Sequence, residues 1–303
     1  MLIIASRKSR LAMWQAKHVQ SILNQKASNL HVEILGISTK GDEVLDRSLS
    51  KIGGKGLFVK ELEVAILEKK AHLAVHSLKD VPMVLPKGFE LGAILEREDP
   101  RDALVSNKFK CLDDFPKNSI IGTSSLRREF QLKIFRPDFN IVPLRGNLDT
   151  RLKKLDEGSM DGIILAAAGL IRLGNKHRIR QFISPEILLP AAGQGAIAIE
   201  VLSSNNETLN LISSLSDLDT SVEVNAERTV SRLLDSSCQL PLAVFCQRTK
   251  ESDVFNLQAK LAMPDGSSCC FVHLNGIDAN ELANIAVEKL LTQGAKKIID
   301  ALQ

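Results

Sequence analysis

The feature that most constrains this fold is an alternation of short apolar runs with segments of helical periodicity. The first pair is the apolar run at residues 2–5 and the segment 9–24, whose apolar side chains recur at helical spacing. The same order returns through the first two thirds of the sequence. It predicts open α/β sheets with helices on both faces.

The alternation falls into two predicted α/β regions, separated by a charged, proline-containing segment at 96–102 that we interpret as a hinge. The first region has predicted strands at 2–5, 31–38, 73–77 and 91–95 and helices at 9–24 and 57–70. The second has strands at 119–122, 139–144 and 162–166 and helices at 125–135 and 148–156. After a return crossing at 188–195, the apolar segment 196–201 is expected to rejoin the first sheet.

The pattern changes from about residue 217. A helix at 224–234 is followed by predicted strands at 242–248, 254–262 and 268–274 and by a terminal helix at 279–291. Consecutive strands of this kind predict a smaller α+β domain with an antiparallel sheet. The expected domains are residues 1–95 with 194–213, residues 100–190, and residues 218–303.

Composition excludes several classes of protein. The chain has 303 residues, 44% of them hydrophobic, which is enough for two or three cores. A net charge of only +3, with 4% aromatic residues and no tyrosine, argues against nucleic-acid binding. The five cysteines form no C-x-x-C pair and the six histidines no H-E-x-x-H motif, so we expect neither a disulfide framework nor a metal site. We expect no membrane span and no secretion signal, hence a cytoplasmic location.

Three predicted strand-to-helix junctions carry hydroxyl and arginine side chains. They contain Arg7 and Ser9; Thr123, Ser125, Arg127 and Arg128; and Arg145 and Arg151. Helix N-termini attract anions, and such junctions converge at the carboxyl ends of the strands. At any one junction, ordinary helix capping with solvated arginines is about equally plausible. Three together favour a polyanionic ligand between the first two domains, with phosphate and carboxylate both possible.

The glycine-rich segment 51–57, which contains Lys55, superficially resembles a phosphate loop. A nucleotide loop needs serine or threonine after Gly-Lys, and Gly56 stands there instead. The remaining interpretations are a mobile, lysine-bearing lid and a plain turn.

Asp80 lies just after the predicted strand 73–77. Pro82 disfavours a helical conformation at Val81, so a constrained extended segment or turn is expected. A carboxylate there can orient N–H donors and stabilise a transient cation, by roughly 4 kcal/mol at about 4 Å and an effective dielectric near 20. By position alone, a turn aspartate paired with Lys79 is the favoured alternative.

Cys238 lies in a polar loop between a predicted helix and a predicted strand, whereas Cys246, Cys269 and Cys270 lie in apolar strands. Among these cysteines, only Cys238 is expected to be accessible, which suits a nucleophile or an attachment point. The alternative is an incidental loop thiol.

Nine segments together resemble the porphobilinogen deaminase family, in the family's order and through essentially the whole chain. They are ASRKSRLAMWQA, GGKGLFVKELE, AVHSLKDVP, EREDPRDALVS, IGTSSLRR, PLRGNLDTRLKKL, ILAAAGLIRLG, LPAAGQGAIAIE and SCQLP. The resemblance implies two α/β domains like those of a periplasmic binding protein, with a cleft between them, and a smaller α+β C-terminal domain.

The resemblance also implies a reaction. A dipyrromethane cofactor would be fixed as a thioether to Cys238, and four porphobilinogens would be added head to tail, each losing ammonia. Hydrolysis would release hydroxymethylbilane. The implied protein is a transferase of tetrapyrrole and haem biosynthesis, usually monomeric, without nucleic-acid or membrane partners.

Roles for individual residues follow from the same resemblance. Asp80 would be the catalytic residue, contacting pyrrole N–H groups and stabilising azafulvene-like cations. The cofactor's acetate and propionate groups would be held by Lys79, Ser125, Arg127, Arg128, Arg145 and Arg151. Substrate and growing chain would be bound by Arg7, Ser9, Thr123 and Arg172, with Lys55 in a flexible loop and Gln194 in the crossover. One departure is Ser236-Ser237, where the family commonly has two glycines.

Two alternatives stay open at this point. A non-catalytic anion-binding module could share the two-domain architecture, but it would carry a secretion signal and need no loop cysteine. A degenerate relative could bind pyrroles without turnover; Ser236-Ser237 favours that possibility and Asp80 argues against it.

Overall fold

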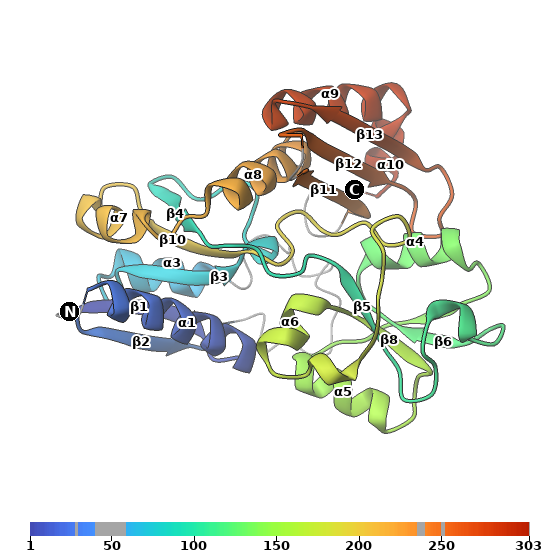
Figure 1. Ribbon diagram of the computed structural model, residues 1–303, viewed down its shortest axis with the longest axis horizontal. Helices are drawn as coiled ribbons and strands as arrows, with labels where there is room; N and C mark the ends of the chain where they lie inside the picture. The colour runs from blue at the N-terminus through green and yellow to red at the C-terminus, as the bar shows by residue number, and fades with distance from the viewer. Residues whose placement is uncertain (28–29, 40–58, 235–239, 250–251, 303) are drawn as a thin grey trace. The chain divides into compact units, whose positions relative to one another are not determined.

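The computed structural model describes residues 1–27, 30–39, 59–234, 240–249 and 252–302 (Figure 1). The chain divides into two compact units. Unit 1 comprises Met1–Glu98 and Gly195–Ser221, and unit 2 comprises Asp99–Gln194 and Val222–Gln303. Unit 1 is thus built from two separate stretches of the sequence.

A five-stranded mixed sheet forms the centre of unit 1. Its order is β2-β1-β3-β10-β4, with β1 parallel to β2 and β3, and β10 antiparallel to both of its neighbours. The strands are β1 (Leu2–Arg7), β2 (Val32–Ile37), β3 (Leu73–Ser77), β4 (Phe89–Ile94) and β10 (Ile197–Leu202). The prediction that the segment at 196–201 rejoins the first sheet is confirmed.

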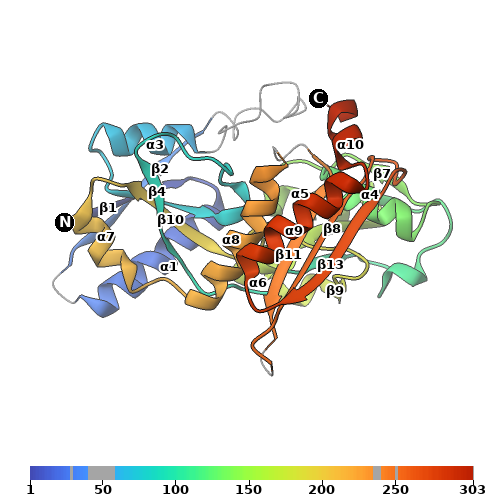
Figure 2. The ribbon, with the colours of Figure 1, turned by 90° about the horizontal axis from the view of Figure 1, so that it is seen from above.

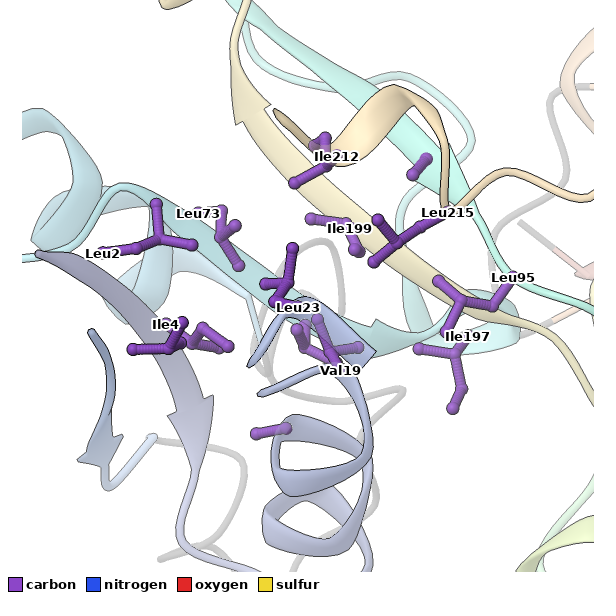
Figure 3. Packing of buried hydrophobic residues seen from close by; sticks show 14 of the residues in the cluster. Leu2, Ile4, Val19, Leu23, Leu73, Leu95, Ile197, Ile199, Ile212 and Leu215 are labelled. Atoms are coloured by element: carbon purple, nitrogen blue, oxygen red, sulfur yellow. The ribbon is translucent and has the colours of Figure 1, made fainter. Parts of the chain in front are cut away.

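Helices cover both faces of this sheet (Figure 2). They are α1 (Arg10–Lys26), α3 (Lys60–Leu67) and α7 (Asn206–Ser213). Side chains alternate along a strand, so Leu73 and Val75 pack with α1 and α7, whereas Ala74 packs with α3. Figure 3 shows the α1 side, where Val19 and Leu23 meet the sheet. Each fully buried aliphatic side chain of this kind contributes about 1.5–3 kcal/mol.

Unit 2 contains a second five-stranded sheet, in the order β7-β6-β8-β5-β9. Its strands are β5 (Asp102–Val105), β6 (Ile120–Gly122), β7 (Asn140–Val142), β8 (Gly162–Ala166) and β9 (Ile179–Phe182). The helix α4 (Leu126–Phe135) packs on one face, and α5 (Leu148–Asp156) and α6 (Ala167–Arg172) pack on the other. The sequence did not predict β5, because Asp102 made its start look like part of the charged hinge, nor the short, half-polar β9.

A smaller antiparallel sheet also lies in unit 2, in the order β11-β12-β13, as the sequence predicted. Its strands are β11 (Leu242–Arg248), β12 (Phe255–Leu261) and β13 (Cys270–Gly276), and α9 (Ala279–Thr292) packs on β12 and β13. Two further helices are α8 (Leu218–Leu233), which begins earlier than predicted, and α10 (Ala295–Leu302), which was not predicted. Whether residues 100–190 and 218–303 are separate domains stays a prediction.

Short 3-10 turns join some of these elements, at Leu78–Asp80, Leu112–Asp114 and Lys176–Arg178. Of the helices in the described part of the chain, none combines the length and the apolar character that crossing a membrane requires.

Candidate active site

Asp80 ends a 3-10 turn that follows β3 directly. The turn is held on both sides of the aspartate. Leu78 is fully buried and its N–H donates to the Ala196 carbonyl at 3.0 Å, while the buried Val81 donates its N–H to the Leu78 carbonyl at 3.1 Å. Val81 is extended before Pro82, as predicted. The Asp80 carboxylate is therefore exposed on a backbone that packing holds in place.

A pocket with a volume of about 60 Å³ lies beside this turn, entirely within unit 1. Its polar lining is Arg7, Ser9, Gln15, His76, Ser77 and Asp80, and its apolar lining is Leu11, Ala12, Val59 and Val75. Ser9 is the N-cap of α1, with its hydroxyl accepting from the Ala12 N–H at 3.4 Å. Gln15 donates to the Ser77 hydroxyl at 2.7 Å and so ties α1 to the end of β3.

Three predicted site residues, Arg7, Ser9 and Asp80, line this pocket together. They come from the end of β1, the start of α1 and the turn after β3, which the parallel pairing of β1 and β3 places side by side. Sequence reasoning missed Gln15 and His76. His76 lies within the AVHSLKDVP segment, but nothing in the sequence showed that its side chain borders a pocket.

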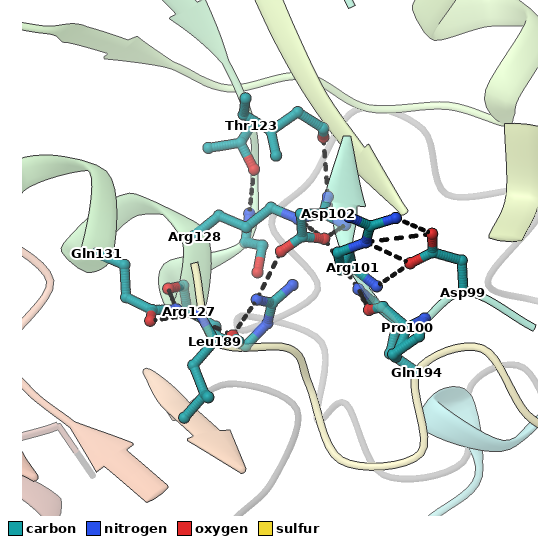
Figure 4. A network of polar contacts seen from close by, with 12 residues as sticks. Asp99, Pro100, Arg101, Asp102, Thr123, Arg127, Arg128, Gln131, Leu189 and Gln194 are labelled. Carbon is teal, nitrogen blue, oxygen red and sulfur yellow. Dashed lines mark hydrogen bonds and ion pairs between the residues drawn. The ribbon is translucent and has the colours of Figure 1, made fainter. Parts of the chain in front are cut away.

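In unit 2, a buried network surrounds the Asp102 carboxylate (Figure 4). Arg127 Nη1 donates to Asp102 Oδ2 at 2.7 Å and to the Leu189 carbonyl at 2.7 Å. Arg128 Nε and Nη2 donate to Asp102 Oδ1 at 3.1 and 2.8 Å, and Nη1 donates to the Ile164 carbonyl at 2.9 Å. Gln194 adds a fourth bond to Asp102, at 3.0 Å. Sequence reasoning missed Asp102 as the partner of these side chains.

This network fixes the ionisation of Asp102. Burial by itself would raise the pKa of Asp102, but the charges and hydrogen bonds of Arg127 and Arg128 lower it below its ordinary value. One carboxylate faces two guanidinium groups, so the cluster of three side chains carries a net positive charge. Among the described residues, both hydrogen bonds of the Arg127 side chain come from Nη1. The cluster therefore anchors α4 firmly and also suits an anion.

The predicted hydroxyl residues of unit 2 lie at the start of α4. The buried Thr123 accepts from the Ser125 N–H at 3.2 Å through its hydroxyl. Ser125 is the N-cap of α4, but its side chain makes no capping hydrogen bond. In this respect it differs from Ser9, whose hydroxyl caps α1.

Arg145 and Arg151 flank the turn into α5. Asn147 caps the helix by accepting from the Thr150 N–H at 2.8 Å, and Arg151 Nε donates to the Gly146 carbonyl at 2.8 Å. Gly146 has φ +109°, and a Cβ there would lie 2.8 Å from Thr150 Cγ2. Only glycine lets the chain turn this closely, which is how the two arginines come to lie on either side of one helix start.

The other predicted site residues are scattered. Lys79 is half-buried in the 3-10 turn before Asp80, Arg172 ends α6, and Gln194 also donates to the Pro100 carbonyl at 2.7 Å. Lys55, Cys238 and the pair at 236–237 lie outside the described residues. The expectation that Cys238 stands out by accessibility needs a correction, because Cys269, which directly precedes β13, is exposed.

The fold and the pocket define a class: an α/β protein whose arginine- and hydroxyl-bearing strand ends suit an anionic small molecule. Residues 2–210 match the family model described as "Porphobilinogen deaminase, dipyromethane cofactor binding domain". The chain is 52% identical to porphobilinogen deaminase of Thiobacillus denitrificans, with 99% of this chain and 98% of that one covered. It is 50% identical to the enzyme of Chromobacterium violaceum, with 99% and 97% covered. The chain belongs to the porphobilinogen deaminase family.

Solved structures similar to this chain include a periplasmic substrate-binding protein of an ABC transporter from Coxiella burnetii. The TM-score is 0.46 at 12% identity, covering 71% of this chain and 91% of that one. The methionine-binding protein MetQ gives a TM-score of 0.45 at 13% identity, covering 75% and 94%.

The described residues fit a dipyrromethane cofactor, whose side chains are carboxylates. Arginine pairs with carboxylates through two parallel hydrogen bonds. Unit 2 provides Arg145 and Arg151 at the start of α5, and at the start of α4 the Ser125 hydroxyl, which makes no capping hydrogen bond. Arg127 and Arg128 add their excess positive charge.

Proposed function

We propose that this member of the porphobilinogen deaminase family joins four porphobilinogens head to tail into hydroxymethylbilane, with Asp80 at the reacting centre. The observation that carries the proposal is the unit 1 pocket, where an exposed carboxylate on a rigid turn stands with Arg7 and Ser9. The pocket thus combines a negative group with donors for anionic substituents.

Asp80 has the right chemistry for the bond-forming step. As ammonia leaves porphobilinogen, positive charge develops on the pyrrole ring and its N–H becomes a stronger donor. A carboxylate at about 4 Å stabilises such a charge by roughly 4 kcal/mol at an effective dielectric near 20. Because Leu78 and Val81 hold the turn, Asp80 needs no reorganisation as the charge appears.

The basic residues match the carboxylates of the substrate. Each porphobilinogen carries two carboxylates, so a growing chain accumulates negative charge. We assign Arg7, Ser9, Thr123 and Arg172 to substrate and product, and Lys79, Ser125, Arg127, Arg128, Arg145 and Arg151 to the cofactor. Lys55 and Gln194 are assigned to the active-site loop and the crossover.

Cys238 is the proposed attachment point. When bound there, the dipyrromethane supplies a nucleophilic pyrrole end that primes the polymer. The chain's own residues hold its carboxylates and orient the incoming monomer. We further propose that the protein is a monomer in the cytoplasm, which size-exclusion chromatography with light scattering and cell fractionation test.

The first test is the intact mass of the purified full-length protein. We expect an added mass equal to two deaminated porphobilinogen units in the parent protein and none in Cys238→Ser. Cys269→Ser is the matched control, an exposed cysteine that should keep the added mass. A parent protein with only its amino-acid mass, before and after incubation with porphobilinogen, would contradict the proposal.

The second test is Asp80→Asn, which keeps the size and polarity of the side chain but removes its charge. We expect turnover of porphobilinogen to fall by about 10²- to 10³-fold, because roughly 3–4 kcal/mol of charge stabilisation is lost. The melting temperature should change little, since Asp80 is exposed. Undiminished turnover would remove Asp80 from the mechanism.

A further inference from the structure

Three titratable side chains lie together in unit 1 and have no place in the mechanism above: His76 on β3, Glu200 on β10 and Glu63 on α3. His76 is 7% exposed, Glu63 is 9% exposed and Glu200 is fully buried. In the antiparallel pairing of β3 with β10, His76 stands opposite Ala198, two residues from Glu200, so the two side chains share a face of the sheet. It is the face on which α3 packs.

The polar atoms of this group are incompletely paired. His76 Nε2 lies 2.9 Å from Glu200 Oε2. Even so, among the described residues neither His76 Nε2 nor either Glu200 oxygen makes a hydrogen bond of acceptable geometry to a backbone or side-chain donor. Buried polar atoms are almost always satisfied, so such a cluster calls for an explanation. A proton held between the two carboxyl groups would supply the missing donor.

The surroundings of Glu63 favour such a proton. Burial, followed by the negative charge of Glu200, raises the pKa of Glu63 to about 7. The cluster can therefore gain or lose one proton near neutral pH, and the exchange belongs to the coupled group rather than to one residue.

His76 connects this group to the pocket, because it also lines the pocket beside Ser77 and Asp80. On α3, Lys60 acts on Glu63 and lowers its pKa, and Glu61 lies on the same helix. Arg7 and Asp80 are the charged residues that line the pocket with His76. His76 therefore belongs both to the pocket lining and to the buried group with Glu200.

We propose that His76 is a proton-relay residue, passing protons between the pocket and the buried pair of Glu200 and Glu63. The proposal rests on the proposed function. Each addition forms one C–C bond and breaks one C–N bond, with both electrons leaving on nitrogen. It also breaks one ring C–H bond, whose electrons stay in the pyrrole. His76 takes that proton, and the relay returns one proton to an amino group, which departs as ammonia, so no oxidant or reductant is needed.

The test uses the full-length, cofactor-bearing protein. His76→Asn keeps a polar side chain but cannot relay protons, and we expect turnover to fall by about 10²-fold with little change in KM for porphobilinogen. His31→Asn is the matched control, an exposed histidine beside Glu33 that should leave turnover unchanged. Unchanged turnover in His76→Asn would overturn the proposal.

A second variant keeps the test decisive if His76→Asn does not fold. Glu63→Gln retains a hydrogen-bond donor to Glu200 but cannot titrate, so the limb of the pH–rate profile near neutral pH should shift or disappear. NMR titration of the His76 ring gives a readout that does not depend on activity. We expect the ring signals of the parent protein to report the titration of Glu63 near neutral pH and this step to be lost in Glu63→Gln, and identical curves would overturn the relay.

The two proposals fail differently. If the parent protein carries no added mass and does not consume porphobilinogen, the proposed function is wrong. If it loads and turns over while His76→Asn and Glu63→Gln match it across pH, only the relay is wrong.

Discussion

Each of the two α/β sheets buries a carboxylate on its fourth strand, but the side chains that surround the two carboxylates differ. In each sheet the fourth strand, β10 or β5, runs antiparallel to its neighbours and carries a buried acid, Glu200 or Asp102. Asp102 receives hydrogen bonds from two arginines and a glutamine. Glu200 faces a histidine and a second glutamate, and within the described part of the chain its oxygens make no well-formed hydrogen bond.

The difference teaches that burial alone does not decide how a carboxyl group titrates. Burial by itself raises the pKa of Asp102 and of Glu63, but at Asp102 the arginine charges outweigh it, so that carboxylate stays ionised. In unit 1, burial and a neighbouring carboxylate act in the same direction on Glu63. The Asp102 cluster stays charged and anchors α4, whereas the Glu63 cluster is able to exchange a proton.

The largest effect in this comparison should come from Asp102→Asn. Removing the charge leaves two buried guanidinium groups unpaired, and we expect the free energy of unfolding to fall by about 3–5 kcal/mol. Denaturant unfolding measures it. Asp300→Asn is the control, because its ion pair with Lys296 is exposed and should matter by less than about 1 kcal/mol. Equal losses in the two variants would show that the Asp102 network is no anchor.

A smaller effect is expected from Glu63→Gln, and it depends on pH. The folded protein holds a proton on Glu63 that the unfolded chain releases above its ordinary pKa of 4.5. The associated stability is fully present below that value and is lost as pH rises through about 7. Between about pH 5 and pH 8, the parent protein should lose about 1–2 kcal/mol more than the variant, allowing for solvent screening.

Unfolding curves at several pH values measure this difference. The exposed Glu68→Gln is the control and should follow the parent protein. If Glu63→Gln also follows the parent protein, Glu63 does not take up a proton on folding, and the contrast with Asp102 is lost.

The smallest effect compares the two N-cap serines, Ser9 of α1 and Ser125 of α4. Ser9→Ala removes a capping hydrogen bond and should lower the free energy of unfolding by about 1 kcal/mol. Ser125→Ala removes no such bond and should cost only about 0.3 kcal/mol or less. A larger loss for Ser125→Ala in cofactor-free protein would mean that its hydroxyl is structural and not reserved for a ligand.

Local sequence determined most of the secondary structure. The strands β3, β8 and β11 and the helix α5 have the predicted bounds, because apolar periodicity and cap residues are short-range signals. The positions of the arginine- and hydroxyl-bearing helix starts and of the turn at Asp80 followed from the same reasoning. The strands that were missed, β5 and β9, are short and contain charged residues, and the short helices α6, α7 and α10 were not predicted either.

Tertiary structure alone decided the partners of the charged groups. The sequence shows Glu200 inside an apolar strand and Asp102 beside a hinge. It does not show that Glu63 and His76 lie next to Glu200. Nor does it show that Arg127 and Arg128 bind Asp102. Those partners are separated by 25 residues or more along the chain. Because a buried charge is stabilised or neutralised by whichever groups the fold brings to it, its ionisation is a property of the packed sheet and not of its own segment.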